Sequence, residues 1–299
     1  MIRFLQNSEI DRNAWDNCIN NAQPTFVYAL SWYLDLVSPG WCGLEEDNYS
    51  AVMPLPVKKK YGINYIMQPV YAQQLGVFST QTISGGKIKT FLEHIPAQYK
   101  YIALNLNFNN FFESSETQLK INNNFELDLN PGYEYLENEY TSNTRRNLKK
   151  ALGLSISFDG TVEELVHLKT ENTGLNRKRI PPKKIIEFVS AVLVFGKGFI
   201  CKATFENKTC AAVFFVYHQK RIYYLIPVSN PTGKEKKAMF AIIDVVIQKF
   251  AGSSLVLDFE GSNIQGLARF FEGFAAVNYP YPTVRINRLP FPLNKFRKS

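Results

Sequence analysis

Three apolar segments in the second half of the chain are separated by very short polar turns. The segments cover 198–206, 209–217 and 221–228 and are rich in β-branched and aromatic residues. The turns at 206–208 and 218–220 are too short for a crossover connection, so neighbouring strands have to run antiparallel. The sequence therefore predicts a three-stranded meander, against which the rest of this half has to pack.

The segments on either side of the meander alternate between helical and extended patterns. Before it we expect a strand over 154–158 and helices over 161–170 and 182–195, the last with its proline in the first turn. After it we expect a long apolar helix over 238–250, a strand over 254–260, a helix over 266–272 and a final strand over 281–289. The second half thus combines one sheet with several helices.

The first half shows a shorter series of the same patterns. Its expected elements are helices over 8–19 and 26–37, strands over 50–57 and 63–67, a helix over 85–94, and strands over 101–106 and 125–129. The asparagine-rich stretch 105–124 is interpreted as loops around that sheet. A polar, basic helix over 133–152 marks a change of character, and we place the domain boundary there, giving domains 1–132 and 133–299.

Composition restricts the kind of site that the chain can carry. The four cysteines form no CxxC pair and only three histidines are present, so a protein-ligated metal site is not expected. No apolar run reaches about 18 residues and the N-terminus has no signal-peptide core, which predicts a cytoplasmic protein without stable membrane insertion. The formal charge of +8 favours an anionic ligand, such as a coenzyme, a tRNA or an acidic membrane surface.

The segment between the meander and the long apolar helix has the features of a phosphate site. Residues 229–237 form a glycine-bearing, lysine-rich loop that runs into a helix. Free N–H groups and the positive dipole end at a helix start bind anions, and lysines add charge. We therefore assign donor or phosphate binding to Ser229, Asn230, Gly233, Lys234 and Lys237. The other interpretation is a solvated loop that caps a buried helix.

Two carboxylates end the apolar strand that follows. Strand alternation places Asp258 and Glu260 on one face, where either could be the general base for an attacking amine. Alternatively, one of them caps the next helix or pairs with Arg269. Tyr224, on the third meander strand, is the candidate acid for the leaving group, and packing in the core is its alternative role. Backbone N–H groups at the end of that strand could stabilise an oxyanion.

Several stretches resemble the tandem-GNAT transferases related to the Fem (FemABX) peptidyltransferases of bacteria. The element order of the second half is that of the GNAT acetyltransferase fold, and the matching stretches are 31–34, 52–56, 68–69, 73–79, 144–151, 258–262 and 270–276. The resemblance implies an α+β protein of two GNAT-like domains in tandem, each a mixed, mainly antiparallel sheet flanked by helices in three layers. It also implies a degenerate donor site in the first domain and a donor site in the second.

The resemblance further implies an N-acyltransferase that moves an acyl or aminoacyl group from acyl-CoA or aminoacyl-tRNA to an amine. The acceptor would be a small molecule or a lipid-linked cell-envelope precursor. The sequence has no long charged heptad insertion of the kind that some Fem enzymes use to bind tRNA. The alternative function is a non-catalytic GNAT scaffold that binds an anionic ligand or partner, which Glu235 in the phosphate loop favours.

Acceptor binding is assigned to residues in both halves. Tyr71 and Gln74 lie in a stretch that resembles the family's cleft-lining segment, and Arg145, Arg146 and Arg269 supply positive charge. A buried amide that bonds to loop backbone is the other role for Gln74. A solvated basic helix face is the other interpretation of the paired arginines.

Overall fold

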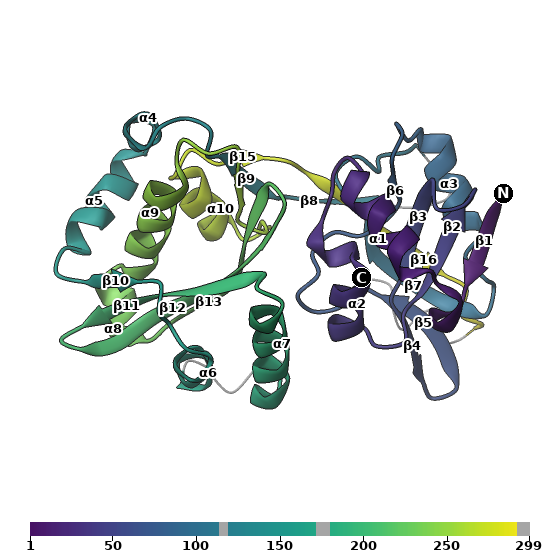
Figure 1. The fold of residues 1–299 in the computed structure, drawn as a ribbon, viewed down its shortest axis with the longest axis horizontal. Helices are drawn as coiled ribbons and strands as arrows, with labels where there is room; N and C mark the ends of the chain where they lie inside the picture. Colours follow the sequence, from purple (N-terminus) through teal and green to yellow (C-terminus); the bar gives the residue numbers. More distant parts are fainter. Residues whose placement is uncertain (114–118, 172–179, 292–299) are drawn as a thin grey trace. The chain divides into compact units, whose positions relative to one another are not determined.

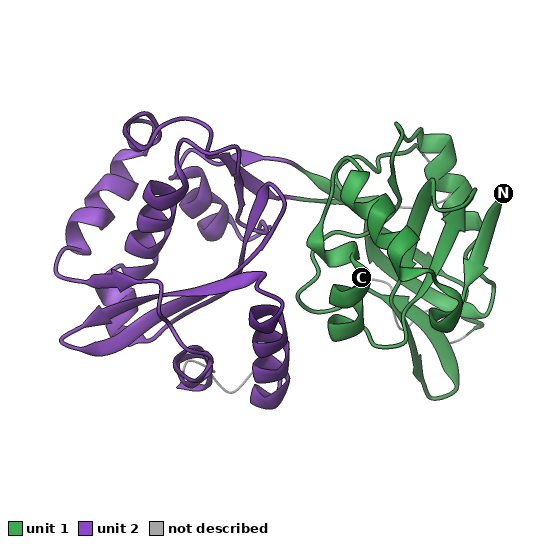
Figure 2. Cartoon of the chain, viewed as in Figure 1, with its two compact units in different colours: residues 1–122, 280–299 green, residues 123–279 purple. Residues whose placement is uncertain are grey.

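The computed structural model describes residues 1–113, 119–171 and 180–291. The chain forms two compact units, which Figure 2 shows in different colours. Unit 1 comprises residues 1–122 and 280–299, and unit 2 comprises residues 123–279. No helix in the described part of the chain is long and apolar enough to cross a membrane.

Unit 1 is built from two sheets and a few helices (Figure 1). Its strands are β1 (Ile2–Leu5), β2 (Cys42–Glu46), β3 (Ala51–Leu55), β4 (Val57–Lys60), β5 (Ile63–Met67), β6 (Phe78–Ser79), β7 (Tyr99–Asn105), β8 (Leu119–Asn122) and β16 (Tyr281–Asn287). Its helices are α1 (Arg12–Asn21), α2 (Ser31–Val37) and α3 (Gly85–Glu93), with the short 3-10 turns η1 (Asn7–Glu9) and η2 (Val27–Ala29). One sheet has the order β1-β2-β3-β6, and the other has the order β4-β5-β7-β16-β8.

The chain passes from one of these sheets to the other at Pro56. β3 is buried along its whole length, whereas the three lysines of β4 are exposed. Pro56 lies between the two strands and has no N–H to continue a ladder, so the pairing partner changes there from β2 to β5. The strand that the sequence predicts over 50–57 is therefore divided between two sheets.

Unit 2 is built on a single large sheet with the strand order β10-β11-β12-β13-β14-β9-β15. Its strands are β9 (Phe125–Asp128), β10 (Ser155–Ser157), β11 (Gly198–Phe205), β12 (Lys208–His218), β13 (Arg221–Ser229), β14 (Val256–Asp258) and β15 (Val277–Asn278). Its helices are α4 (Tyr133–Asn138), α5 (Ser142–Lys150), α6 (Val162–Glu171), α7 (Pro182–Val194), α8 (Pro231–Glu235), α9 (Ala238–Phe250) and α10 (Gln265–Glu272). The predicted meander is confirmed, since β11, β12 and β13 pair antiparallel in sequence order.

The helices of unit 2 cover both faces of its sheet. Figure 1 shows α5, α9 and α10 on one side of the long strands and α6 and α7 on the other. α9 is the most apolar of them, and its fully buried Ile242, Val246 and Ile247 pack against alternate residues of the meander such as Val213 and Phe215. The apolar helix predicted over 238–250 is confirmed with the same bounds.

The two units divide the chain differently from the expected domains 1–132 and 133–299. The division falls after Asn122, because β9 pairs with β14 and β15 in the sheet of unit 2. The last strand, β16, pairs with β7 and β8, so it belongs to unit 1. Strand pairing between distant parts of the chain sets these boundaries, and local sequence patterns carry no information about it.

Three further segments differ from the sequence prediction. The helix expected over 133–152 is divided into α4 and α5. Thr141 is the N-cap of α5 and accepts a hydrogen bond from the Thr144 N–H, so a second helix begins there. The asparagine-rich stretch contains β8, which was expected to be loop. β1 and β2 were not predicted, and they pair with each other at the edge of the four-stranded sheet.

We expect a fragment of residues 123–279 to fold and a fragment of residues 133–299 to remain largely unfolded. The longer fragment loses β9, whose Phe125 and Leu127 are almost fully buried, and it carries β16 without its partner strands. Amide NMR spectra of the two fragments test this. Well-dispersed resonances from 133–299 would contradict the boundary.

Candidate active site

The parallel pairing of β13 with β14 ends after three residue pairs. These pairs are Arg221 with Val256, Ile222 with Leu257, and Tyr223 with Asp258. β13 then continues to Ser229 with β12 as its strand partner in the described part of the chain. The second edge of β13 is therefore unpaired beyond Tyr223, which leaves backbone hydrogen-bonding groups available there.

Two features of β13 fit an unpaired edge. Leu225 has no partner on β12, because Tyr224 pairs with Phe215 and Ile226 with Phe214, so the strand has a β-bulge directly after the last pair with β14. Pro227 lies in the middle of the strand, where a missing N–H is tolerated only if it faces no neighbouring strand.

The loop after β13 is arranged differently from the predicted phosphate loop. A short helix, α8, comes between β13 and α9, and Asn230 caps it by accepting the Gly233 N–H at 3.0 Å. The Gly233 N–H is therefore engaged within the protein. Gly233 is buried, and its Cα lies against the Cys210 carbonyl and the Ser229 side chain, so glycine is required there for packing.

The start of α9 is the helix end in this loop that no side chain caps. Lys237 occupies the N-cap position with a positive φ of 59° and makes no capping hydrogen bond with its side chain. The Nζ atom of Lys236 lies 4.5 Å from the centre of the Phe205 ring, which holds that lysine against the sheet. The first N–H groups of α9, near Lys234 and Lys237, are therefore the candidate for anion binding in this loop, in place of those around Gly233.

We expect Gly233→Ala to lower the free energy of unfolding of unit 2 by about 1–3 kcal/mol. The added methyl group would meet the Cys210 carbonyl, a backbone atom that cannot turn aside. Gly266→Ala is the matched control, because a methyl group there has open space and lies in helix α10. Equal unfolding free energies of the two variants in chemical denaturation would contradict the packing role.

Asp258 is not available as a general base. Its side chain is fully buried, its Oδ2 accepts the Arg221 guanidinium at 2.9 Å, and its Oδ1 accepts the Glu260 N–H at 2.9 Å. The alternative of pairing with Arg269 does not apply to this carboxylate, since its partner is Arg221. The carboxylate thus joins β14 to β13 and holds the turn that follows β14.

Glu260 lies in that turn and not on the strand. β14 ends at Asp258, and Glu260 and Gly261 both have positive φ values of 57° and 54°. The alternation that would place Glu260 on the same face as Asp258 therefore does not extend this far. A glutamate in this strained conformation is held by the Asp258 hydrogen bond to its N–H.

Arg221 is shared between two carboxylates. Its Nη1 lies 2.7 Å from Glu126 Oε1 on β9 and 2.9 Å from Asp258 Oδ2 on β14. Asn124 donates to the same Glu126 oxygen at 3.1 Å. This cluster of buried charges connects three neighbouring strands at the point where the β13–β14 pairing ends.

Burial and the neighbouring Asp258 raise the pKa of Glu126 to about 7, against the opposing effect of Arg221. Burial also raises the pKa of Asp258, whereas the two carboxylates outweigh burial and raise the pKa of Arg221. Sequence reasoning missed Glu126 and Arg221. The signal was weak: Arg221 is a single charged residue in an otherwise apolar strand, and Glu126 is one of two carboxylates on a short strand.

We expect Glu126→Gln to flatten the pH dependence of unit 2 stability between pH 4.5 and about 7. The folded state keeps the Glu126 proton up to about pH 7, whereas the unfolded chain releases it near 4.5, so the free energy of unfolding falls as pH rises through this window. Glutamine removes this dependence and keeps an oxygen that can accept from Arg221.

Thermal unfolding followed by circular dichroism measures the effect. All three tryptophans, Trp15, Trp32 and Trp41, lie in unit 1, so tryptophan fluorescence identifies the transition of that unit separately. Glu163→Gln, at an exposed carboxylate of α6, is the control. An unchanged pH profile in Glu126→Gln would contradict the assignment.

Tyr224 packs in the core. Its ring lies 5.8–6.1 Å from the rings of Phe215, Phe259 and Phe271, and burial raises the pKa of its hydroxyl well above the usual value. The alternative role for this tyrosine therefore holds, and the hydroxyl is a poor proton donor.

The arginines assigned to acceptor binding lie on exposed helices of unit 2. Arg145 donates to the carbonyls of Glu137 and Asn138 at the end of α4, and Arg146 donates to Asn143. The Arg145 contacts tie α5 to α4, the Arg146 contact stays within α5, and the rest is a solvated basic helix face. Arg269 is exposed on α10 and makes no ion pair within the described residues.

In unit 1, the strand edge that corresponds to the unpaired edge of β13 is covered by a segment of the same unit. The parallel pair β5–β7 is extended by a bridge between Leu75 and Leu106, and the Gln68 N–H bonds to the Ala103 carbonyl. Gln74 is fully buried, and its Oε1 accepts the Phe108 N–H at 3.0 Å. Gln74 is thus a structural amide and lies away from solvent.

Tyr71 belongs to the same closed segment. It has a positive φ of 66°, and its carbonyl accepts the Tyr33 hydroxyl. Burial raises the pKa of its own hydroxyl to about 12. In the described part of unit 1, the strand edge that corresponds to that of β13 is therefore paired.

No protein-family model and no curated protein matches the sequence. Among solved structures, the chain is similar to FemX, with a TM-score of 0.68 and 11% identity over 97% of this chain and 99% of that one. It is also similar to a tandem GNAT protein from the clavulanic acid biosynthesis pathway, with a TM-score of 0.57 and 8% identity over 97% and 99% of the two chains.

A third similar structure is the C-terminal domain of a putative lysylphosphatidylglycerol synthetase from Agrobacterium fabrum. Its TM-score is 0.56 with 10% identity, over 97% of this chain and 95% of that one. Identities this low describe the fold alone. The predicted fold class is confirmed: the chain has the tandem GNAT-like fold that FemX and the tandem GNAT protein represent.

Proposed function

We propose that the chain is an N-acyltransferase that moves an acyl or aminoacyl group from an activated donor to an amine. The observation that carries the proposal is the unpaired edge of β13 beyond Tyr223, with its bulge at Leu225. An extended donor arm can lie along such an edge and pair with its backbone, as an added strand does.

The charged end of the donor is assigned to the loop that follows. The uncapped start of α9, at Ala238, lies nine residues after the end of β13 at Ser229, and Lys234 and Lys237 precede it. Helix N–H groups and lysines together bind phosphate. Acyl-CoA and aminoacyl-tRNA both have phosphates beyond the reacting carbonyl, and we assign acyl-CoA as the first choice of donor.

The chemistry requires few side chains. The acceptor nitrogen attacks the donor carbonyl, the new C–N bond forms, and the C–S or C–O bond to the carrier breaks through a tetrahedral intermediate. Backbone N–H groups on the edge of β13 hydrogen-bond to the developing oxyanion. Glu260, held at its backbone by Asp258, is the base that takes the amine proton.

The acceptor is an amine on a small molecule or on a lipid-linked precursor. No group of histidine, cysteine or carboxylate side chains suited to a metal ion occurs in the described part of the chain.

Binding of acetyl-CoA and of deacylated tRNA, each measured by titration calorimetry, tests the donor assignment. We expect saturable binding of acetyl-CoA and roughly tenfold weaker binding by Lys234→Ala/Lys237→Ala, since a loss of about 1.4 kcal/mol is tenfold. Lys149→Ala/Lys150→Ala removes the same charge from exposed positions of α5 and is the control. If only tRNA binds, aminoacyl-tRNA replaces acyl-CoA as the assigned donor. If neither binds, the proposed donor site is refuted.

A non-catalytic binding module is the second candidate function. It is favoured by the closed packing around Gly233, whose N–H is already taken by Asn230, and by Glu235 in the same helix. Saturable acetyl-CoA binding without transfer to any primary amine in a panel of diamines, amino acids and aminosugars would select this function.

A further inference from the structure

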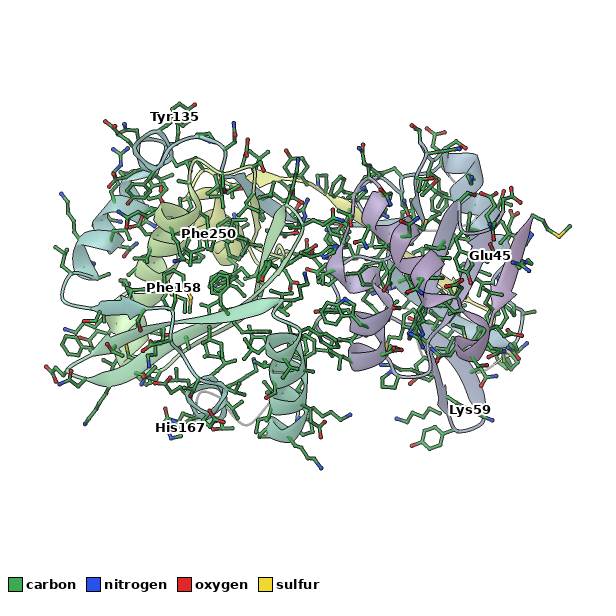
Figure 3. All side chains as sticks on the ribbon, viewed as in Figure 1. Glu45, Lys59, Tyr135, Phe158, His167 and Phe250 are labelled. Carbon is green, nitrogen blue, oxygen red and sulfur yellow. The ribbon has the colours of Figure 1, made fainter. Side chains whose placement is uncertain are left out.

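The β4–β5 hairpin of unit 1 projects from its sheet and is strongly basic (Figure 1). β4 is an edge strand, and Lys58, Lys59 and Lys60 are all exposed on it. Figure 3 shows the labelled Lys59 side chain on this hairpin. Because side chains alternate along a strand, the three ammonium groups lie on both of its faces.

These lysines differ in their partners from several other cations of unit 1. Arg3, Arg12 and Lys87 each pair with a carboxylate. Lys58, Lys59 and Lys60 pair with no carboxylate among the described residues. Their charge is thus uncompensated by the protein and available to an external anion.

The tip of the hairpin is an aromatic residue in an unfavourable conformation. Tyr61 is 91% exposed and has a positive φ of 50°, followed by Gly62 at 75°. Asparagine, aspartate or glycine is the usual residue at such a position, and an exposed ring gains nothing from burial in the fold. The Lys60 Nζ lies 5.1 Å from the centre of the Tyr61 ring. A ring at this position is explained by contact with something outside the protein.

Two further cations lie at the same end of the five-stranded sheet. Asn64 pairs with Tyr99, and the Arg288 N–H bonds to the Lys100 carbonyl at 2.7 Å, so Lys100 and Arg288 follow the hairpin tip across the sheet. Lys100 is exposed. Lysines on an edge strand also prevent unwanted strand pairing, but that function accounts for neither the tyrosine at the tip nor the exposed Lys100 on the inner strand β7.

We propose that the tip of the β4–β5 hairpin docks on the surface of an acidic phospholipid bilayer. Tyrosine prefers the interface between headgroups and acyl chains, and lysines around it bind anionic headgroups. Tyr61 and Lys58 are separated by about 10 Å along the strand, close to the thickness of a headgroup layer of roughly 5–8 Å. All three lysines therefore reach headgroups when the ring reaches the interface.

RNA is the other polyanion that lysines and an aromatic ring can bind. Proteins that bind single strands use a groove with several aromatic rings in succession. This hairpin is a protruding tip with one fully exposed ring, which favours a flat or soft anionic surface.

Vesicle flotation at low salt tests the proposal without any need for catalysis. We expect the full chain to float with phosphatidylcholine vesicles that contain 30 mol% phosphatidylserine, roughly the anionic share that gives a strong surface potential, and to stay in solution with phosphatidylcholine alone. Lys58→Gln/Lys59→Gln/Lys60→Gln should lower the partition coefficient about a hundredfold, at about fivefold per lysine. Tyr61→Asn, which suits the positive φ, should lower it several-fold.

The control is Lys149→Gln/Lys150→Gln/Lys208→Gln, which removes the same charge from exposed lysines of unit 2. This variant should keep most of the binding, and circular dichroism should show the same melting profile for all variants. Failure of the full chain to float, or equal losses in both triple variants, would overturn the proposal. Loss of tRNA binding in the hairpin variant, with no vesicle binding by the unaltered chain, would assign the hairpin to RNA instead.

Discussion

One half-buried guanidinium joins three strands at the centre of the sheet of unit 2. Arg221 at the start of β13 lies within 2.9 Å of carboxylates on both β14 and β9, strands that are adjacent only in the folded protein. Removing Arg221 would leave Glu126 and Asp258 close together without their shared cation, which is costly. The cluster therefore fixes which strands meet and in which register. It also marks where the parallel pairing of β13 and β14 stops.

The candidate site follows from that arrangement. Beyond Tyr223 the edge of β13 has no strand partner, and the bulge and Pro227 are both compatible with such an edge. The same Asp258 that holds Arg221 also holds the Glu260 N–H, so the turn after β14 is positioned by the charge cluster. In unit 1 the corresponding edge is filled by residues around Gln74. Among the described residues, this unpaired strand edge occurs in unit 2 and its counterpart in unit 1 is paired.

Much of the secondary structure could be predicted, because it depends on local periodicity. The meander, the apolar helix α9 and the helix α3 were found from the spacing of apolar residues and from short turns. The short edge strands β1 and β8 were not, because they have too few residues to show a period. The predicted catalytic residues Asp258 and Tyr224 are buried in the fold. In the sequence, a carboxylate at the end of a strand gives the same pattern whether it faces solvent or pairs with an arginine inside the fold.

The sequence by itself determined the class of fold, the order of most elements and the loop in which a phosphate site was to be sought, since these follow from turn length, periodicity and glycine and lysine content. Only the tertiary structure decided where the units divide, since β9 and β16 join their sheets through pairings with strands far away in sequence. It also decided that Asn230 caps α8 and that the uncapped helix start is that of α9. Charge pairing and strand pairing are contacts between distant residues, and their partners are chosen only when the chain has folded.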